Sequence, residues 1–347
     1  METRRRLFPF LGVLRGLYRS RTVRTLVVYV LAILTSATAA PQVDEWRIRM
    51  DEGKRAEDAG DFAAASRSYR SATEVAERFD RTDQRRAAAW NALAMMDDAM
   101  GQLANAVSEY RRALKAAEES SGKASSNYAL VLGNLGTVYA EMGQNARGEK
   151  LVREALAFYV TATPRDELRV AAMQNCLAEV LLVRRKYGEA EGLLIGARAV
   201  LEKHPEDPTD LGVALNNLGA LRVYKGEYAE GERLLMQALE TIEKRMGPDH
   251  PLLLRTLSNL ASVAGRMGNR EAAGARLNRA MDLAGKRLGA DHPLYGILLA
   301  NYAAYLREGG DKSGAKAVQA RSVQILKNSG RSNGIGAVVD ISALKGQ

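Results

Sequence analysis

Few side chains in this sequence could do metal or thiol chemistry. Its 347 residues include three histidines and one cysteine, Cys176. His250 and His292 each stand in an Asp-His-Pro tripeptide and recur at a 42-residue interval, and His204 also precedes a proline. Because a zinc ion needs about four ligands within ~2 Å and a disulfide needs two cysteines, we expect no metal, no other cofactor and no disulfide within the chain. Cys176 is expected to be a small buried residue.

The patterns expected of nucleophilic or phosphate chemistry are also weak. The sequence has no Gly-x-x-x-x-Gly-Lys-[Ser/Thr] loop. Lys312 and Ser313 follow two glycines, but they lack a preceding strand and fit a turn that recurs along the chain. No nucleophile, base and orienting group stand together, so we expect that the protein is not an enzyme.

The net charge of +9 is concentrated at the start of the chain. Residues 1–39 carry seven arginines and one acidic residue, and the rest is near neutral, with 43 basic and 40 acidic residues. Acidic and basic residues alternate along most segments, whereas binding to a phosphate backbone needs basic residues clustered on one face. We therefore expect no nucleic-acid partner.

The first 39 residues have the order of a secretory signal. An arginine-rich start is followed by the apolar run Leu26 to Leu34, and then by small residues ending in Ala37-Thr38-Ala39, which fits an A-x-A cleavage site. The apolar run is shorter than the ~20 residues that a membrane span needs. We expect a cleaved signal peptide and export, to a bacterial periplasm or into the medium. The alternative is an uncleaved N-terminal anchor, which would be the chain's one contact with a membrane.

The elements that carry the remaining residues repeat along the chain. A turn signal recurs at intervals of 41 or 42 residues, centred on Gly60, Gly101, Gly143, Arg185, Gly226, Gly268 and Gly310. On both sides of each turn, apolar or small residues recur with helical spacing, as in Leu132, Leu135 and Tyr139. Each unit is therefore predicted to be a helix, a tight turn and a second helix. Where Arg185 replaces glycine, we expect a strained or remodelled turn.

These units resemble the tetratricopeptide repeat. The resemblance lies in Trp90, Leu93 and Ala94 before one turn and in Ala106, Tyr110 and Ala113 after it. The 42-residue length, the segment Leu215 to Gly219 (LNNLG) and the linkers 246–251 (MGPDHP) and 288–293 (LGADHP) are similar to the kinesin light chain type. The resemblance implies an all-α fold, a right-handed α-solenoid of about seven helix-turn-helix repeats over residues 46–328, followed by a flexible tail, 329–347.

The resemblance also implies a peptide-binding groove on the concave side of the solenoid. Counting each turn residue as position 15 of its repeat, the apolar seam lies at positions 4, 7, 8 and 11, and a 100° step per residue puts positions 2, 5, 6, 9, 12 and 13 on the groove side. Asparagines recur at positions 5 and 6, where their amides could bind the backbone of an extended peptide. The alternative is that they bond neighbouring helices. The predicted peptide-binding residues are Asn91, Asn134, Asn175, Asn216, Asn217, Asn259, Asn301, Tyr224, Arg255 and Arg266. The arginines predict a basic end of the groove.

We accordingly expect a non-catalytic scaffold that binds extended segments of protein or peptide partners in its concave groove. The alternative is a structural or oligomer-forming envelope component that binds through its helical edges or its convex face. An apolar outer face on the second helices would favour that alternative.

Overall fold

The computed structural model describes residues 42–205 and 209–329. By their contacts the residues divide into two units, 1–49 and 50–347, and the second unit contains the helical repeats. The predicted signal peptide, and the predicted tail from residue 330 onward, lie outside the described residues.

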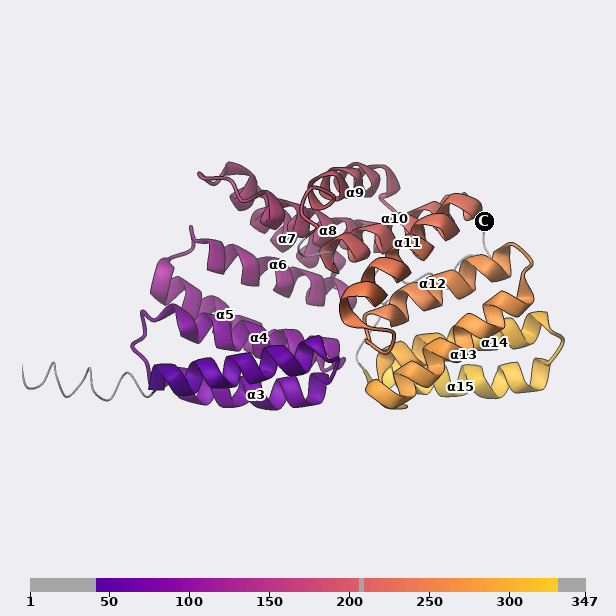
Figure 1. Ribbon diagram of the computed structural model, residues 1–347, viewed down its shortest axis with the longest axis horizontal. Helices are drawn as coiled ribbons and strands as arrows, with labels where there is room; N and C mark the ends of the chain where they lie inside the picture. Colours follow the sequence, from indigo (N-terminus) through magenta and orange to yellow (C-terminus); the bar gives the residue numbers. More distant parts are fainter. Residues whose placement is uncertain (1–41, 206–208, 330–347) are drawn as a thin grey trace, which may run out of the picture. The chain divides into compact units, whose positions relative to one another are not determined.

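Every regular element in the described part of the chain is a helix. After a helix over residues 42–58 come α3 (Phe62–Ala76), α4 (Gln84–Ala99), α5 (Leu103–Ser121), α6 (Ser126–Glu141), α7 (Asn145–Thr161), α8 (Glu167–Val183), α9 (Tyr187–Leu201), α10 (Thr209–Tyr224), α11 (Tyr228–Met246), α12 (Leu253–Arg266), α13 (Arg270–Arg287), α14 (Pro293–Glu308) and α15 (Lys312–Asn328). They form the seven antiparallel pairs that the repeat predicts, and each pair packs chiefly on the next (Figure 1).

The turn inside each pair has the same backbone form in all seven repeats. The residue at position 15 has a positive φ in every copy, from 57° at Arg185 to 89° at Gly310. The next N–H then bonds back to the carbonyl five residues earlier, as Gln102 does to Asp97 and Lys186 does to Leu181. This is the Schellman end of a helix, which favours glycine. Arg185 is therefore strained as predicted, but its turn is not remodelled.

Small residues let the paired helices approach closely. A Cβ added at Gly136 would lie 2.9 Å from the backbone oxygen of Gly148, and one added at Gly148 would lie 2.5 Å from the oxygen of Gly136. The same pairing recurs between Gly219 and Gly231. The buried residues of the repeats form several hydrophobic clusters, rich in leucine, valine and alanine. Cys176 packs against one of these clusters, and burial raises the pKa of its thiol to about 12.

The linkers before α12 and α14 begin the next helix at different points. Pro293 is the first residue of α14, whereas α12 begins at Leu253, two residues after Pro251. In both linkers the histidine, rather than the preceding aspartate, accepts a backbone N–H through its ring Nδ1: from Leu252 at 3.2 Å and from Leu294 at 3.1 Å.

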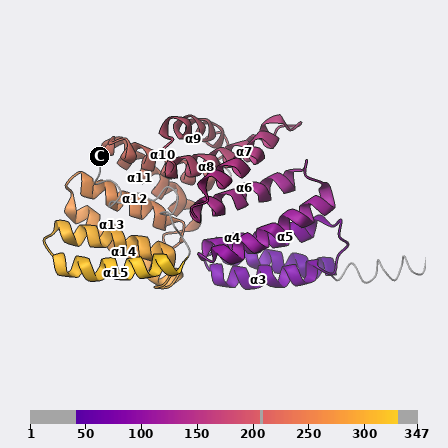
Figure 2. The ribbon, with the colours of Figure 1, turned by 180° about the vertical axis from the view of Figure 1, so that it is seen from behind.

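The array curves until its later repeats contact its first ones (Figures 1 and 2). Nε2 of His250 lies 3.1 Å from the carbonyl oxygen of Glu57, and Nε2 of His292 lies 3.0 Å from that of Ala99. Both pairs are 193 residues apart in sequence. We call these two contacts the closure.

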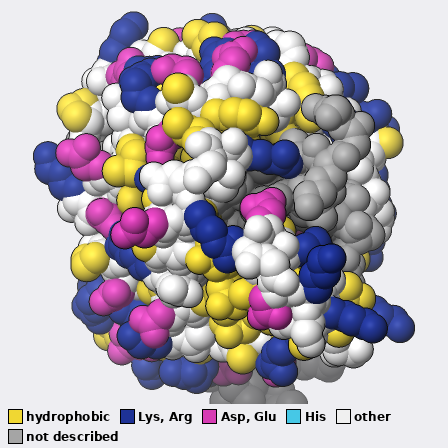
Figure 3. Space-filling view, turned by 90° about the vertical axis from the view of Figure 1, so that its right-hand side faces the viewer, with side chains coloured by type: hydrophobic (Ala, Val, Ile, Leu, Met, Phe, Trp, Pro, Cys, Tyr) yellow, Lys and Arg dark blue, Asp and Glu magenta, His cyan; other side chains and the backbone are white. Residues whose placement is uncertain are grey.

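The outer surface carries mixed charge. On the face drawn in Figure 3, acidic and basic side chains alternate with apolar ones instead of gathering into one basic patch. Many are paired on one helix or between neighbouring helices, as Arg233 is with Glu230 and Arg276 with Glu232. This arrangement follows the alternation of charge in the sequence, because paired surface charges are favoured over blocks of one sign.

Candidate functional site

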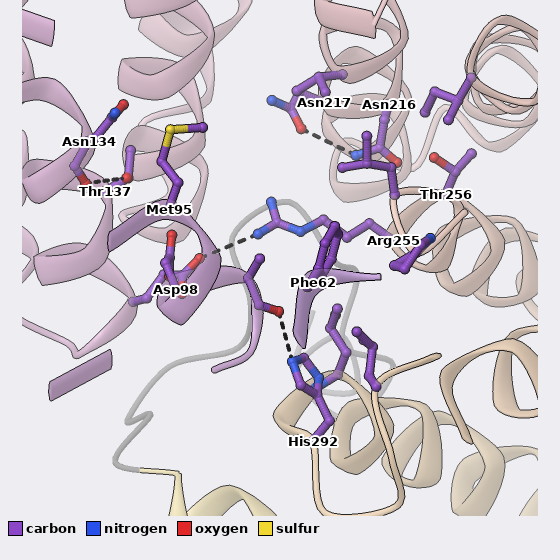
Figure 4. Close-up of a pocket in the computed structure, with 18 of the residues that line it drawn as sticks. Phe62, Met95, Asp98, Asn134, Thr137, Asn216, Asn217, Arg255, Thr256 and His292 are labelled. Carbon is purple, nitrogen blue, oxygen red and sulfur yellow. Dashed lines mark hydrogen bonds and ion pairs between the residues drawn. The ribbon is translucent and has the colours of Figure 1, made fainter. Parts of the chain in front are cut away.

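A cavity of about 300 Å³ lies on the inner side of the array, between the first helices of four repeats. Its wall includes Met95 on α4, Thr137 on α6, Val213 on α10 and Thr256 on α12 (Figure 4). These helices present their positions 2, 3 and 9 to it, and positions 2 and 9 are on the side that the helical step predicts to face the groove. A volume of this size is at the lower end of ligand pockets, which suits a side chain with its adjoining backbone.

The closure forms one boundary of this cavity. Pro251, Leu252 and His292 from the two linkers line it, together with Phe62 at the start of α3. A Cβ at Gly60 would lie 2.5 Å from Cδ of Pro251, so this turn needs glycine both for its backbone and for the contact. The cavity therefore exists in this form only while the later repeats contact the first ones.

Hydrogen bonding defines the protonation state of the two closure histidines. A carbonyl oxygen can only accept, so Nε2 of His250 and of His292 must carry the proton. Nδ1 accepts a backbone N–H in both, so it must lack one. The rings are therefore neutral. Burial lowers the pKa of His250, an effect that nearby Arg287 reinforces and that the Glu57 carbonyl and the carboxylates of Glu57 and Asp58 oppose.

Arg255 extends toward the cavity from α12, and its charge is already countered. Its guanidinium pairs with Glu179 at 2.5 Å and with Glu141 at 3.4 Å, on helices far earlier in the chain. Burial by itself would lower the pKa of Arg255, but these two carboxylates and Asp98 outweigh it and raise that pKa. The basic end of the groove predicted around Arg255 is therefore not basic at this residue.

The predicted asparagine row connects successive repeats. Nδ2 of Asn134 donates to Oδ1 of Asn91 at 3.1 Å, and Nδ2 of Asn259 donates to Oδ1 of Asn216 at 3.0 Å. In each bond position 6 of one repeat meets position 5 of the repeat before it. Asn301 donates to Oγ of Ser258 in the same manner. Asn175, at position 5, instead donates to the backbone carbonyl of Asp210 at the start of α10, in the repeat that follows. The asparagines thus bond neighbouring helices, and their use in binding a peptide stays a prediction.

Asn217 differs from the rest of the row. Its Oδ1 accepts from Nδ2 of Asn216 at 3.2 Å, while its own Nδ2 has no hydrogen-bond partner among the described residues. The side chain is 1% exposed and lines the cavity, and its nitrogen points away from Asn216 (Figure 4). Oγ1 of Thr256, equally buried, also lacks a partner in the described part of the chain. Each such group costs about 1–3 kcal/mol unless something binds it.

Four of the ten predicted residues meet at this cavity and six do not. Those that line it are Asn134, Asn216, Asn217 and Arg255. Tyr224 instead stacks on Tyr187, with ring centroids 5.7 Å apart, and Arg266 ends α12 outside the cavity wall. Asn91, Asn175, Asn259 and Asn301 are buried between repeats.

Sequence reasoning missed Asp98, Glu141 and Thr256 in the cavity wall. Asp98 is at position 12 and Glu141 at position 13, both of which the helical step places on the groove side, so that signal could have found them. Thr256, at position 3, has no such signal. Among the described residues, no group of three or more His, Cys, Asp and Glu side chains is placed to hold a metal ion.

Comparisons with known proteins agree with this architecture. A tetratricopeptide repeat profile matches residues 85–159, 210–286 and 254–328. The chain therefore belongs to the tetratricopeptide repeat family. Part of it is similar to a kinesin light chain-related protein. As its repeats predict, the fold is a right-handed α-solenoid.

Its relatives are distant. Protein KINESIN LIGHT CHAIN-RELATED 2 of Arabidopsis thaliana is 29% identical over 140 residues, which are 40% of this chain and 21% of that protein. A Rap protein complexed with Competence and Sporulation Factor superposes with a TM-score of 0.54 at 13% identity, over 82% of this chain and 98% of that one. BtubC (BKLC) from P. vanneervenii has a TM-score of 0.48 at 18% identity, over 67% and 91%.

Proposed function

We propose that this protein is a non-catalytic scaffold that recognises an extended segment of a partner protein, part of which enters the cavity on its concave side. The observation that carries the proposal is the cavity itself, with the buried Nδ2 of Asn217 in its wall, which has no hydrogen-bond partner among the described residues. An amide N–H in that state favours a ligand with a carbonyl oxygen, which every peptide bond offers. Membership of a repeat family whose folds serve protein–protein interaction supports the same class of function.

The outer face gives less support to the alternative, an oligomer-forming envelope component. The second helices do carry exposed apolar side chains, such as Val160, Ile195, Met236 and Val323. Each is one residue on its helix, and single exposed apolar residues are ordinary on soluble proteins. A sedimentation experiment that gave a defined oligomer would favour this alternative.

Export is a further part of the proposal, and it rests on residues 1–39 alone. No helix in the described part of the chain is long and apolar enough to cross a bilayer. N-terminal sequencing of the protein recovered from cells tests the proposal, because cleavage after Ala39 would leave Ala40 as the first residue.

The binding proposal is tested by selecting ligands from a library of random peptides displayed on phage, with the purified chain as target. The Met95→Trp variant should lose the selected peptides, because Met95 lines the cavity and is 38% exposed, so an indole there fills the space. The matched control is Met236→Trp on α11, where the side chain is 46% exposed and outside the cavity. Equal binding by both variants would remove the cavity from the proposal.

A further inference from the structure

We propose that the chain carries a ligand for its own cavity: residues 337–341 (AVVDI), beyond the last repeat, occupy the cavity until a segment of a partner displaces them. We call these five residues the tail segment. They lie outside the described residues, in the part of the sequence that follows Ser329. The inference rests on the proposed function and adds a means of regulating it.

The wall of the cavity is mainly apolar. Besides Met95 it includes Ile242 on α11, Leu252 before α12 and Leu294 on α14. Covering such a wall is favourable for aliphatic side chains, because it removes apolar surface from water on both partners. Nδ2 of Asn217 adds a hydrogen-bond donor that a backbone carbonyl of the same ligand would satisfy. The cavity therefore favours an apolar segment of peptide.

The described chain ends beside this wall. The last helix, α15, runs back along α14 (Figure 1), which itself begins at the cavity. Leu294 in the cavity wall and Leu326 near the end of α15 both pack against Ile297. Ser329, where the described residues end, comes three residues after Leu326. The residues that follow Ser329 therefore start close to the cavity.

The sequence beyond Ser329 has the length and the composition that the proposal needs. Residues 330–336 (GRSNGIG) are small or polar apart from Ile335, which is typical of a linker, and seven residues span up to about 23 Å. The tail segment then has two valines and an isoleucine among its five residues. Since these β-branched residues favour an extended backbone, the tail segment is a ligand of the class that the proposed function describes.

An extended backbone divides the tail segment into two sides, because successive side chains point in opposite directions. Ala337, Val339 and Ile341 share one side, which is wholly apolar. Val338 and Asp340 share the other side. We expect the first side to face the cavity wall, because a carboxylate buried against apolar side chains would lose its hydration.

Attachment to the array strengthens the effect of a weak contact. A segment on a short linker acts at an effective concentration in the millimolar range. If the free segment had a dissociation constant of about 0.1 mM, an effective concentration of about 1 mM would weaken the apparent affinity for a partner about tenfold. The tail segment would thus act as a competitor that a strong partner displaces and a weak one does not.

The first test measures how the full chain binds the library peptides that Met95→Trp blocks. Selection uses both the wild type and the double variant Val339→Asp and Ile341→Asp, whose charges should expel the tail segment from the apolar wall. The double variant should bind these peptides about tenfold more tightly than wild type does. The matched control is Val338→Asp with Ser342→Asp, which adds the same charge on the other side of the extended backbone and should leave the affinity unchanged. Circular dichroism shows whether each variant is folded.

A second measurement detects the contact directly, with a labelled synthetic peptide of residues 335–344. Fluorescence anisotropy should show this peptide binding to the chain that carries Val339→Asp and Ile341→Asp, because its own tail segment no longer competes. Adding Met95→Trp to that chain should abolish the binding. Adding Met236→Trp, at an exposed position outside the cavity, should leave it unchanged.

The outcomes separate this inference from the proposed function. If the peptides that Met95→Trp blocks bind wild type and both double variants equally, the inference is overturned and the proposed function stands. A labelled peptide that does not bind would also overturn the inference. So would a gain in affinity that depends on protein concentration, because the tail segment would then bind a second copy of the chain. If neither selection yields a peptide that Met95→Trp blocks, the proposed function is overturned, and the labelled peptide alone decides whether the cavity takes the tail segment.

Discussion

Two kinds of contact hold the array in its form, and they differ in chemistry and in number. Neighbouring repeats meet through buried leucine, valine and alanine, and each pair of repeats supplies its own share of that core. The closure instead depends on two histidine–carbonyl bonds, each across 193 residues, and on prolines that pack against turn glycines. A solenoid needs the first kind in order to fold. The second kind shapes the cavity, so damage to it should alter binding more than folding.

The largest effect is expected from the core between neighbours. Leu221 on α10 is fully buried, and Leu221→Ala should cost about 2–5 kcal/mol of stability because it leaves a cavity among close-packed side chains. Leu168→Ala removes the same atoms at a site that is 38% exposed, and it should cost much less. Urea unfolding followed by circular dichroism measures both. Equal losses would mean that this core is not what holds the repeats together.

The next effect concerns a buried acid between the first two repeats. Burial, with the charge of Asp97 beside it, raises the pKa of Glu109 to about 7. The folded state therefore keeps a proton that the unfolded state releases near pH 4.5. The stability that protonated Glu109 contributes is fully present below about pH 4.5 and is lost as the pH rises through 7. The loss amounts to roughly 3 kcal/mol at most.

The Glu109→Gln variant isolates that effect, because an amide keeps the shape of the side chain and cannot ionise. Wild type should lose urea resistance between pH 5 and pH 8 relative to this variant. Glu118→Gln, at an exposed position on the same helix, should behave as wild type does. Parallel pH curves for all three proteins would contradict the raised pKa.

Alanine substitutions at two turn glycines compare a turn that is part of the closure with a turn that is not. Gly60 and Gly226 have φ values of 72° and 80°, so alanine at either should cost roughly 1–2 kcal/mol of backbone strain. Only at Gly60 would the new Cβ also collide with Pro251, whereas nothing lies within 4 Å at Gly226. Gly60→Ala should therefore open the closure, with a larger radius of gyration in X-ray scattering and weaker peptide binding. Gly226→Ala should change neither.

The smallest effect is expected from acid on the closure. Since burial lowers the pKa of His250 below its usual 6.5, the folded closure favours the neutral ring. The stability that the neutral His250 ring gives to the closure is fully present above about pH 6.5. It is lost as the pH falls toward the lowered pKa of this ring. Protonation at Nδ1 would also set two N–H groups against each other at Leu252.

Scattering between pH 7.5 and 5.5 should therefore show a small increase in the radius of gyration. The control is the double variant His250→Gln and His292→Gln, whose amides can donate to the same carbonyls but do not titrate in this range. A closure that stays intact in wild type at the lower pH would show that the histidines contribute little to it.

The helical step identified more of the site than the chemistry of single residues did. Positions 2, 9, 12 and 13 face the cavity through Val213, Met95, Asp98 and Glu141. The hydrogen-bond and ion-pair partners of single residues did not follow from residue type: most asparagines bond each other, and Arg255 is paired with acids from α6 and α8. Orientation follows from helix geometry, which is local, whereas a side chain's partners depend on which other helix lies opposite.

The sequence by itself determined the repeat, its turns and the side of each helix that faces the core. All of these follow from interactions within about 42 residues, and even Arg185 adopts the turn that its position in the repeat requires. Only the tertiary structure decided that His250 and His292 would meet the carbonyls of Glu57 and Ala99 and so bound a cavity. That contact depends on small rotations summed over several repeats, and no single repeat's residues encode the sum.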